Sequence, residues 1–180
     1  MRPNNLKMIV AASKSNGIGY KGKMPWYIPM DMDFFKKMTI GEGNNAVIMG
    51  RNTWESLPRK KFLPGRDNLI LSRSKDIRGE KDNECIHSFG DVNKLMEFCD
   101  FKKYDETWVI GGSEIYDLFI NDSRLQEIYK THVNHEFECD TFFPKIPSNF
   151  EMKMMGSNSY QTLFYWNEKY SLINHNKDCP

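Results

Sequence analysis

The stretch Trp108-Val109-Ile110-Gly111-Gly112-Ser113-Glu114-Ile115-Tyr116 indicates the fold class of this chain. Its first three residues are continuously apolar, which is typical of a strand covered on both faces, and a helical pattern follows the two glycines. A strand that leads directly into a helix is the building unit of an α/β protein with a parallel sheet. The glycines allow a ligand close to the backbone, and Ser113 can cap a helix whose amino end faces a pyrophosphate. Because the stretch lacks the spacing GxGxxG, the nucleotide signal is weak by itself, and Tyr116 fits a core position equally well.

The same alternation of apolar runs and helical patterns continues in both directions along the chain. We expect strands at residues 8–12, 46–49, 68–71, 108–110 and 128–133, and helices at 30–39, 51–56, 92–99 and 114–119. Residues 150–155 and 162–170, separated by Gly156-Ser157-Asn158, read as an antiparallel hairpin. The sequence therefore predicts one α/β domain over residues 1–180, with a mixed, mostly parallel central sheet flanked by helices and an antiparallel C-terminal hairpin.

Composition excludes several classes of protein. A net charge of +1 argues against a general nucleic-acid-binding surface, so we expect no nucleic-acid partner. Apolar runs are too short for a signal peptide or a membrane span, and a cytoplasmic protein without a membrane partner is expected. No CxxC pair occurs, and His132 and His135 would point to opposite faces of a strand, so no metal site is expected. Without a heptad pattern, a monomer is the default.

A glycine-rich loop follows the first expected strand. Gly17, Gly19 and Gly22 lie within residues 13–25. Such a backbone can approach a ligand or move over it, whereas a flexible surface connection would have the same composition. Glycine content does not separate the two interpretations.

Asp31 stands on an otherwise apolar helical face. Phe34, Phe35 and Met38 follow it at i+3, i+4 and i+7. Desolvation should raise the pKa of this carboxyl, which could hold a cationic or amidine-like group of a flat heterocycle. Alternatively, Asp31 is an ordinary acidic residue that favours the amino end of a helix.

Two further clusters follow strands and carry cationic side chains. Gly50 and Arg51 stand at one strand-to-helix junction, and Ser72 and Arg73 end another strand. Carboxyl ends of parallel strands share one edge, where a phosphate could reach two guanidinium groups and a hydroxyl. This set suits a phosphate monoester and so points to NADP rather than NAD, although solvated surface arginines would give the same pattern.

Taken in order, these segments resemble the dihydrofolate reductase family along nearly the whole chain. The matching text is Ile9-Val10-Ala11-Ala12, Asn16-Gly17-Ile18-Gly19, Met24-Pro25-Trp26, Asp31 with Phe34-Phe35 and Thr39, Val47-Ile48-Met49-Gly50-Arg51 with Thr53-Trp54-Glu55-Ser56, Leu63-Pro64-Gly65-Arg66, Leu71-Ser72-Arg73, Ile110-Gly111-Gly112-Ser113 with Tyr116, Tyr129-Lys130-Thr131-His132, and Cys139-Asp140-Thr141-Phe142-Phe143-Pro144. The ordered set favours the ligand-binding interpretation of Asp31 and of the arginines.

The resemblance implies a set of substrate-binding residues. Asp31 would hold the 2-amino group and N3 of the pterin of dihydrofolate, with Thr131 supporting that contact through water. Arg66 would pair with the α-carboxylate of the glutamate tail. Antifolates such as methotrexate would use the same site, and the residues implied are Val10, Ala11, Ile28, Asp31, Phe35, Leu57, Leu63, Arg66, Ile110 and Thr131.

It also implies an NADPH site. The nicotinamide would lie near Ala11, Ala12 and Ile18, with Tyr116 near its reacting edge, and the Gly111–Gly112 peptide would be cis. The loop from Ser13 to Trp26 would be an active-site lid. The cofactor residues implied are Ala11, Ala12, Ile18, Gly19, Met24, Gly50, Arg51, Asn52, Thr53, Leu71, Ser72, Arg73, Ile110, Gly111, Gly112, Ser113, Glu114, Ile115 and Tyr116.

The implied reaction is the reduction of 7,8-dihydrofolate to tetrahydrofolate, which supplies one-carbon metabolism. Asp31, Thr131 and Tyr116 form the expected catalytic set. Hydride would pass to pterin C6, and N5 would be protonated from water, with Asp31 polarising the ring rather than donating directly.

Two other functions remain open at this point. The NADPH-dependent pyrimidine reductase of riboflavin biosynthesis shares the fold, but Asp31 and Arg66 in their contexts argue against it. A catalytically silent folate- or nucleotide-binding module would bind cofactor without turnover. The sequence does not decide whether the gene continues into a fused thymidylate synthase, which is found in some protist relatives of the family.

Overall fold

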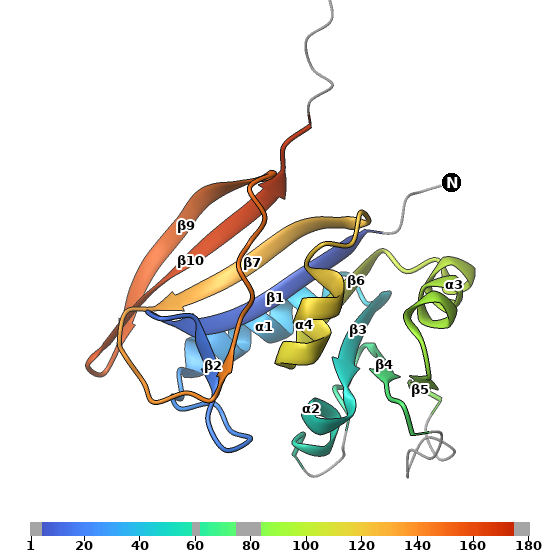
Figure 1. Cartoon of the computed structure of the whole chain (residues 1–180), viewed down its shortest axis with the longest axis horizontal. Helices are drawn as coiled ribbons and strands as arrows, with labels where there is room; N and C mark the ends of the chain where they lie inside the picture. Colours follow the sequence, from blue (N-terminus) through green and yellow to red (C-terminus); the bar gives the residue numbers. More distant parts are fainter. Residues whose placement is uncertain (1–4, 59–61, 75–83, 175–180) are drawn as a thin grey trace, which may run out of the picture.

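The computed structural model describes residues 5–58, 62–74 and 84–174, and its framework is one eight-stranded sheet (Figure 1). The strands of this sheet are β1 (Leu6–Ser13), β3 (Asn45–Gly50), β4 (Asp67–Leu71), β5 (Ile86–Phe89), β6 (Glu106–Gly111), β7 (Leu125–Val133), β9 (Phe150–Tyr160) and β10 (Leu163–Leu172). Two short strands, β2 (Gly17–Gly19) and β8 (Thr141–Phe142), form a separate two-stranded sheet. The helices are α1 (Pro29–Ile40), α2 (Arg51–Glu55), α3 (Val92–Lys102) and α4 (Ser113–Phe119).

The sheet is mixed, as predicted. Its strand order is β5-β4-β3-β6-β1-β7-β10-β9, and every pairing from β5 to β7 is parallel. The last two strands pair antiparallel with β7 and with each other. Parallel pairing brings the carboxyl ends of β1, β3, β4 and β6 to one edge of the sheet, where loops can form a binding site.

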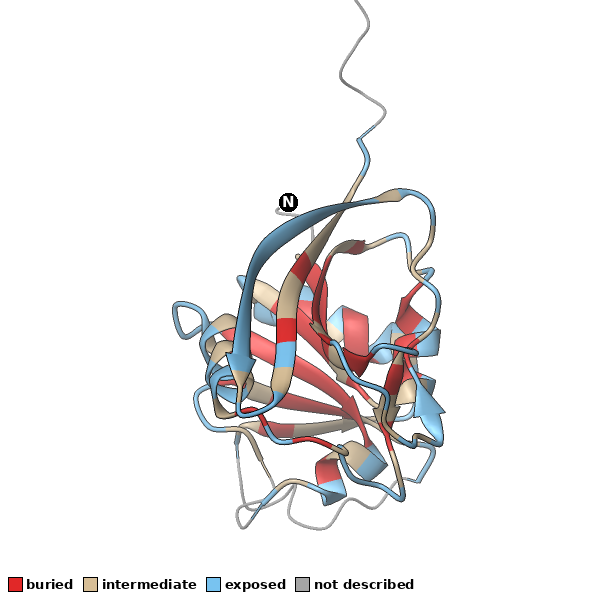
Figure 2. Cartoon of the chain, turned by 90° about the vertical axis from the view of Figure 1, so that its left-hand side faces the viewer, coloured by how far each residue is buried: buried red, intermediate tan, exposed pale blue. Residues whose placement is uncertain are grey.

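Helices cover both faces of the parallel strands, and alternate residues of each strand face opposite layers. Ile48 packs with α3 and α4, whereas its neighbours Val47 and Met49 pack with α1 and α2. Figure 1 shows α4 in front of the sheet and α1 behind it. This two-sided burial explains why the strands read as continuous apolar runs (red in Figure 2), whereas the edge strand β9 is exposed along most of its length.

Local sequence fixes the ends of the helices. Pro29 occupies the first turn of α1, where its missing N–H costs nothing, and Gly41 ends the helix with φ 53°. The side chain of Asp91 accepts a hydrogen bond from the backbone N–H of Lys94 and so caps α3. These signals account for the agreement between the predicted and observed helices.

The position of the hairpin turn was predicted wrongly. Gly156 lies inside β9 opposite Asn167, beside a bulge, and the chain reverses at Gln161, which has φ 53°. Gly-Ser-Asn is as typical of a bulged strand as of a turn, so the residues alone did not decide. The strands β2, β5 and β8 were missed because they are short and interrupted by polar residues.

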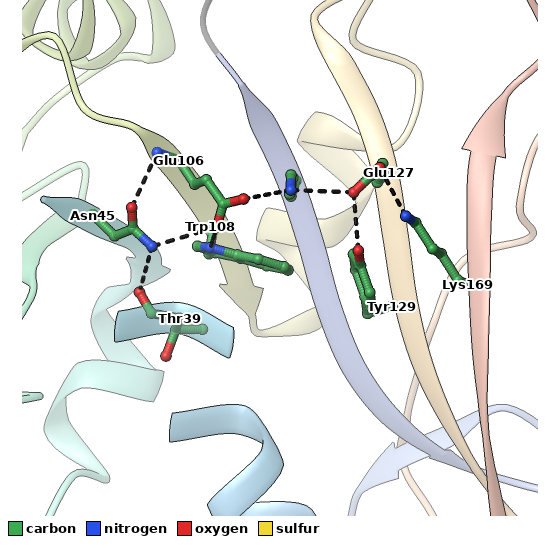
Figure 3. A network of polar contacts seen from close by, with 8 residues as sticks. Thr39, Asn45, Glu106, Trp108, Glu127, Tyr129 and Lys169 are labelled. Atoms are coloured by element: carbon green, nitrogen blue, oxygen red, sulfur yellow. Dashed lines mark hydrogen bonds and ion pairs between the residues drawn. The ribbon is translucent and has the colours of Figure 1, made fainter. Parts of the chain in front are cut away.

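A polar network crosses five strands on the α1 side, in the amino halves of four parallel strands and the carboxyl half of the antiparallel strand β10 (Figure 3). At its centre, Lys7 Nζ on β1 lies 2.5 Å from Glu106 Oε1 on β6 and 3.2 Å from Glu127 Oε2 on β7. Lys169 on β10 pairs with Glu127 at 3.1 Å. Asn45 on β3 donates to Glu106 Oε2 at 3.4 Å and to the carbonyl of Thr39 at 3.1 Å. Each charge therefore has a partner from a neighbouring strand.

Within the described residues, no helix has the length and apolarity needed to cross a membrane. The same residues contain no cluster of three or more His, Cys, Asp or Glu side chains that could bind a metal. His132 stacks on Trp166 at 4.2 Å between ring centroids, whereas His135 contacts Phe137.

Lys7→Met should lower the free energy of unfolding by roughly 2–4 kcal/mol, because it leaves two poorly exposed carboxylates without their shared cation. Chemical denaturation at pH 7 measures this loss. Lys94→Met is the control, since the pair of Lys94 with Asp91 is exposed and should contribute less than about 1 kcal/mol. Equal effects of the two substitutions would show that the network contributes no special stability.

Candidate active site

Asp31 lies in the first turn of α1, and its carboxylate faces the sheet rather than solvent. Its Oδ1 accepts a hydrogen bond of 2.6 Å from the hydroxyl of Thr131, which is 2% exposed on β7. Burial raises the pKa of Asp31, and the bond from Thr131 opposes that rise only in part. The predicted desolvation of this carboxyl is therefore confirmed.

Thr131 has a second polar partner that the sequence did not reveal. Asn167 on β10 donates from Nδ2 to Thr131 Oγ1 at 2.8 Å. The register of the two strands explains this contact, since Asn167 and Thr131 are directly opposite each other. A hydrogen-bonded chain thus runs from β10 through β7 to the carboxylate on α1.

Apolar residues from several elements surround this end of α1. Phe35, Leu57, Leu63 and Ile110 pack against one buried cluster, which contains Val47, Met49 and Trp108. Ile28 and Ala11 belong to the adjoining cluster with Trp26. The indole Nε1 of Trp26 is buried without a hydrogen-bond partner among the described residues. Val10 packs on the opposite face, so its side chain does not share this wall.

Arg66 is a buried cation at the other end of α1, with 5% of its surface exposed. Nη1 donates to Thr39 Oγ1 at 2.8 Å, and Nε donates to the carbonyl of Pro64 at 3.0 Å. In the described part of the chain, no carboxylate pairs with it, and burial lowers its pKa. The guanidinium is therefore oriented by neutral acceptors and keeps a positive charge that a ligand carboxylate could neutralise.

The residues predicted for a cofactor come together at the carboxyl edge of the sheet. A Cβ placed on Gly112 would lie 3.5 Å from Thr53 Oγ1, and one on Gly50 would lie 2.9 Å from Ile115 Cγ1. The loop after β3 and the loop after β6 are therefore neighbours. The Gly111–Gly112 peptide bond is cis, as predicted.

The two predicted phosphate-binding arginines differ in their surroundings. Arg51 Nε donates to Glu55 Oε1 at 2.8 Å, and both side chains are nearly half exposed. Arg73 is exposed and has no ion-pair partner in the described ranges. Ser72 precedes it and accepts from the backbone N–H of Ser74. Hydroxyl, guanidinium and backbone donors of this edge fit an anionic phosphate.

Ser113 does not cap α4 with its side chain, so that prediction was wrong. Gly112 occupies the capping position, and its carbonyl accepts from the backbone N–H groups of Ile115 and Tyr116. The hydroxyl of Tyr116 donates to the carbonyl of Ile9 at 2.8 Å, and its ring packs beside Gly111 and edge-on to Phe143. Burial raises the pKa of this phenol, which is a core residue beneath the cis peptide.

The glycine-rich loop is held by specific contacts. β2 pairs with β8, and a Cβ on Gly19 would come within 2.6 Å of Thr141 Oγ1. Lys21 donates its backbone N–H to Asp140 Oδ2 at 2.9 Å. Lys130, which is 8% exposed on β7, donates to Asn16 Oδ1 at 2.7 Å. Gly17 and Gly19 are therefore required for close packing in this conformation, while Met24 is exposed.

Comparisons with known proteins agree with this geometry. The sequence model of the family described as dihydrofolate reductase matches residues 5–166. A dihydrofolate reductase from Candida albicans is 41% identical over 152 residues, which cover 79% of this chain and 77% of that protein. One from Heliothis virescens is 37% identical, with 78% and 80% covered. A bifunctional dihydrofolate reductase-thymidylate synthase from Arabidopsis thaliana is 36% identical, and the match spans 79% of this chain but 27% of that longer protein.

Asp31→Asn should raise the free energy of unfolding at pH 7 by roughly 0.5–2 kcal/mol, as replacement of an active-site charge often does. An acid whose pKa is higher in the folded state lowers stability above its unfolded pKa, and this loss disappears as the pH falls through the folded pKa. Denaturation from pH 7 to pH 3 should therefore show the gain shrinking with acid. Asp33→Asn, on the exposed side of the same helix, should change stability little, and a destabilised Asp31→Asn at neutral pH would contradict the desolvation argument.

Proposed function

The chain belongs to the dihydrofolate reductase family, and we propose that it reduces 7,8-dihydrofolate to tetrahydrofolate with NADPH as the hydride donor. The observation that carries this proposal is the carboxylate of Asp31. Burial raises its pKa, and the hydrogen bond from neutral Thr131, rather than a cation, opposes that rise. Such a group favours a ligand with two adjacent N–H donors, as the 2-amino group and N3 of a pterin provide. The reduced product would enter one-carbon metabolism.

Asp31 and its surroundings would bind and orient the pterin. The carboxylate holds the donor edge of the ring, and Ile28, Phe35 and Leu57 contact its flat faces. Backbone carbonyls of Val10 and Ile110 would lie beside the ring, where an amine of an antifolate such as methotrexate could also donate. Leu63 and Ala11 complete the apolar wall. Exclusion of water by these side chains strengthens the contact with Asp31.

Arg66 would bind the α-carboxylate of the glutamate tail. Thr39 and Pro64 already direct two of its N–H groups, so little side-chain entropy is lost on binding. A carboxylate at this point would neutralise a buried charge, which favours an acidic substrate over a neutral one.

The carboxyl edge of the sheet would hold NADPH. Ala12, Ile18, Gly19 and Met24 would lie on the side of the cofactor that faces residues 13–26. Tyr116 would support the backbone on which the cofactor rests. Gly50, Arg51, Asn52, Thr53, Leu71, Ser72 and Arg73, with Gly111, Gly112, Ser113, Glu114 and Ile115, supply the donors and close backbone approach for its phosphates. When bound, the cofactor supplies the hydride.

Asp31 is proposed to polarise the pterin rather than to protonate N5. It would sit at the edge of the ring that carries the 2-amino group, away from the reacting C6–N5 bond. The proton for N5 would then come from water admitted at the lid formed by residues 13–26. Thr131 contributes by holding the carboxylate in place.

We also propose a cytoplasmic monomer that binds neither nucleic acid nor a membrane. Every residue assigned to the site comes from one chain, so no second copy is needed to complete it. Light scattering of the purified protein as it elutes from a size-exclusion column would measure its mass in solution.

The direct test follows NADPH oxidation by absorbance, with dihydrofolate and with or without methotrexate. Rapid, methotrexate-sensitive oxidation is expected. Asp31→Asn should lower turnover by about a hundredfold or more, because polarisation of the ring is lost, whereas Asp33→Asn should keep it. Cofactor binding without turnover would instead favour the pyrimidine reductase or a silent binding module.

Arg73 provides a test of cofactor choice. Arg73→Gln should raise KM for NADPH by roughly 10- to 100-fold, because a charge-assisted bond to the 2′-phosphate is lost. KM for NADH, which lacks that phosphate, should not change. Lys94→Gln, a loss of charge on α3, is the control. An equal loss for both cofactors would place Arg73 away from the 2′-phosphate.

A further inference from the structure

The chain of contacts from Asn167 to Asp31 has a fixed direction. The hydroxyl of Thr131 has one proton, and the carboxylate of Asp31 can only accept it, at 2.6 Å. The oxygen of Thr131 must therefore accept from Asn167, whose Nδ2 lies 2.8 Å away. With the amide reversed, its carbonyl would compete for the proton that Thr131 already donates, so the orientation of Asn167 is determined by Asp31.

The backbone around Asn167 allows it to make this contact. Its partner across to β9 is Gly156, which has no side chain to compete for the amide, and the register of β9 and β10 shifts between Asn167 and Glu168. Such irregularities re-aim side chains in sheets. Asn167 lies directly beyond the match to the family model, which ends at residue 166.

The contacts make the two carboxylate oxygens of Asp31 inequivalent. A proton bound to Oδ1 would face the proton of Thr131, which would have to turn away. The N–H of Asn167 opposes this rotation of the Thr131 hydroxyl, because it occupies one of the other positions around the hydroxyl oxygen. Oδ2 has no such donor among the described residues and so remains the oxygen for a proton, while the second lone pair of Oδ1 stays available to a ligand donor.

Few other ionisable groups lie near the carboxylate of Asp31. From β10, Tyr165 is the ionisable neighbour, since burial and the carboxylate together raise its pKa. On β7, Lys130 and His132 alternate with Thr131 and point to the other face. On α1 itself, Asp33, Lys36 and Lys37 are exposed. The polar contacts of Oδ1 therefore lead through Thr131 to Asn167.

We propose that Asn167 is a positioning residue that acts through Thr131 to hold the proton of that hydroxyl on Oδ1 of Asp31, leaving Oδ2 as the oxygen that takes up protons. The inference rests on the proposed role of Asp31 in the reaction. It adds a residue of the C-terminal hairpin to the determinants of the active site.

The test is a titration of the Asp31 carboxyl by NMR in protein labelled with ¹³C aspartate, with the Asp31→Asn spectrum identifying its signal. Asn167→Leu, which keeps the volume but removes the donor, should raise the midpoint by about half a pH unit, the size expected from one neutral hydrogen bond. Asn167→Ala should shift it in the same direction without added bulk, and guards against misfolding of the leucine variant. Asn121→Leu, in the exposed turn after α4, is the control and should leave the midpoint unchanged.

Thr131→Val separates an action through Thr131 from a general change of the sheet. It should raise the midpoint, and adding Asn167→Leu to it should then change nothing more. Unchanged midpoints in both Asn167 variants, or additive effects with Thr131→Val, would overturn the proposal. Since the titration needs no turnover, an inactive protein with the expected shifts would refute the proposed function alone, and an active one without them would refute this inference alone.

Discussion

Parallel pairing of β1 with β6 and β7 is the constraint on which the rest of the molecule depends. Parallel strands require crossover connections, and these place helices on both faces, so the strands must be apolar on both sides. The same pairing brings the loops after β3, β4 and β6 to one edge. Gly112 lies beside Thr53 because their strands are neighbours there, although the residues are far apart in sequence.

Polar groups inside this framework fall into two kinds. Lys7 lies between two carboxylates, and each of these has further partners, so the network satisfies its own charges. Arg66 and Asp31 are also desolvated, but each is oriented by neutral groups, Thr39 and Thr131. The positive charge of Arg66 and the negative charge of Asp31 both lie on the α1 side, and no oppositely charged side chain of the described residues pairs with either. Such a pair of charges matches a ligand with a donor edge at one end and a carboxylate at the other.

How far the sequence predicted the molecule depends on the range of each signal. Continuous apolar runs and helix ends are local, and the four helices and the parallel strands other than β5 were located from them. Helical spacing placed Asp31 on an apolar face but left an ordinary helix-start residue open, and the family resemblance decided between the two. Asn167 and Thr39 were not given roles because their contacts cross from one element to another and depend on register. The sequence did contain one signal for Asn167, because it is a polar residue directly after the aromatic run Phe164-Tyr165-Trp166. Ser113 and Gly156 were misread because each residue type suits two neighbouring positions, a cap or a first turn, and a turn or a bulge.

The glycine-rich loop of residues 13–25 illustrates why composition alone does not define motion. Gly17 and Gly19 stand where a side chain would collide with residues of the segment that includes β8, and Lys21 and Asn16 bind to Asp140 and Lys130. Opening the loop would break these contacts together, including the bond to the poorly exposed ammonium of Lys130, which would have to be satisfied by water. The conformation is therefore set by packing and by a few polar bonds, and the glycines make the close approach possible. Because β7 carries Lys130 on one face and Thr131 on the other, a single strand holds both the glycine-rich loop and the carboxylate of Asp31.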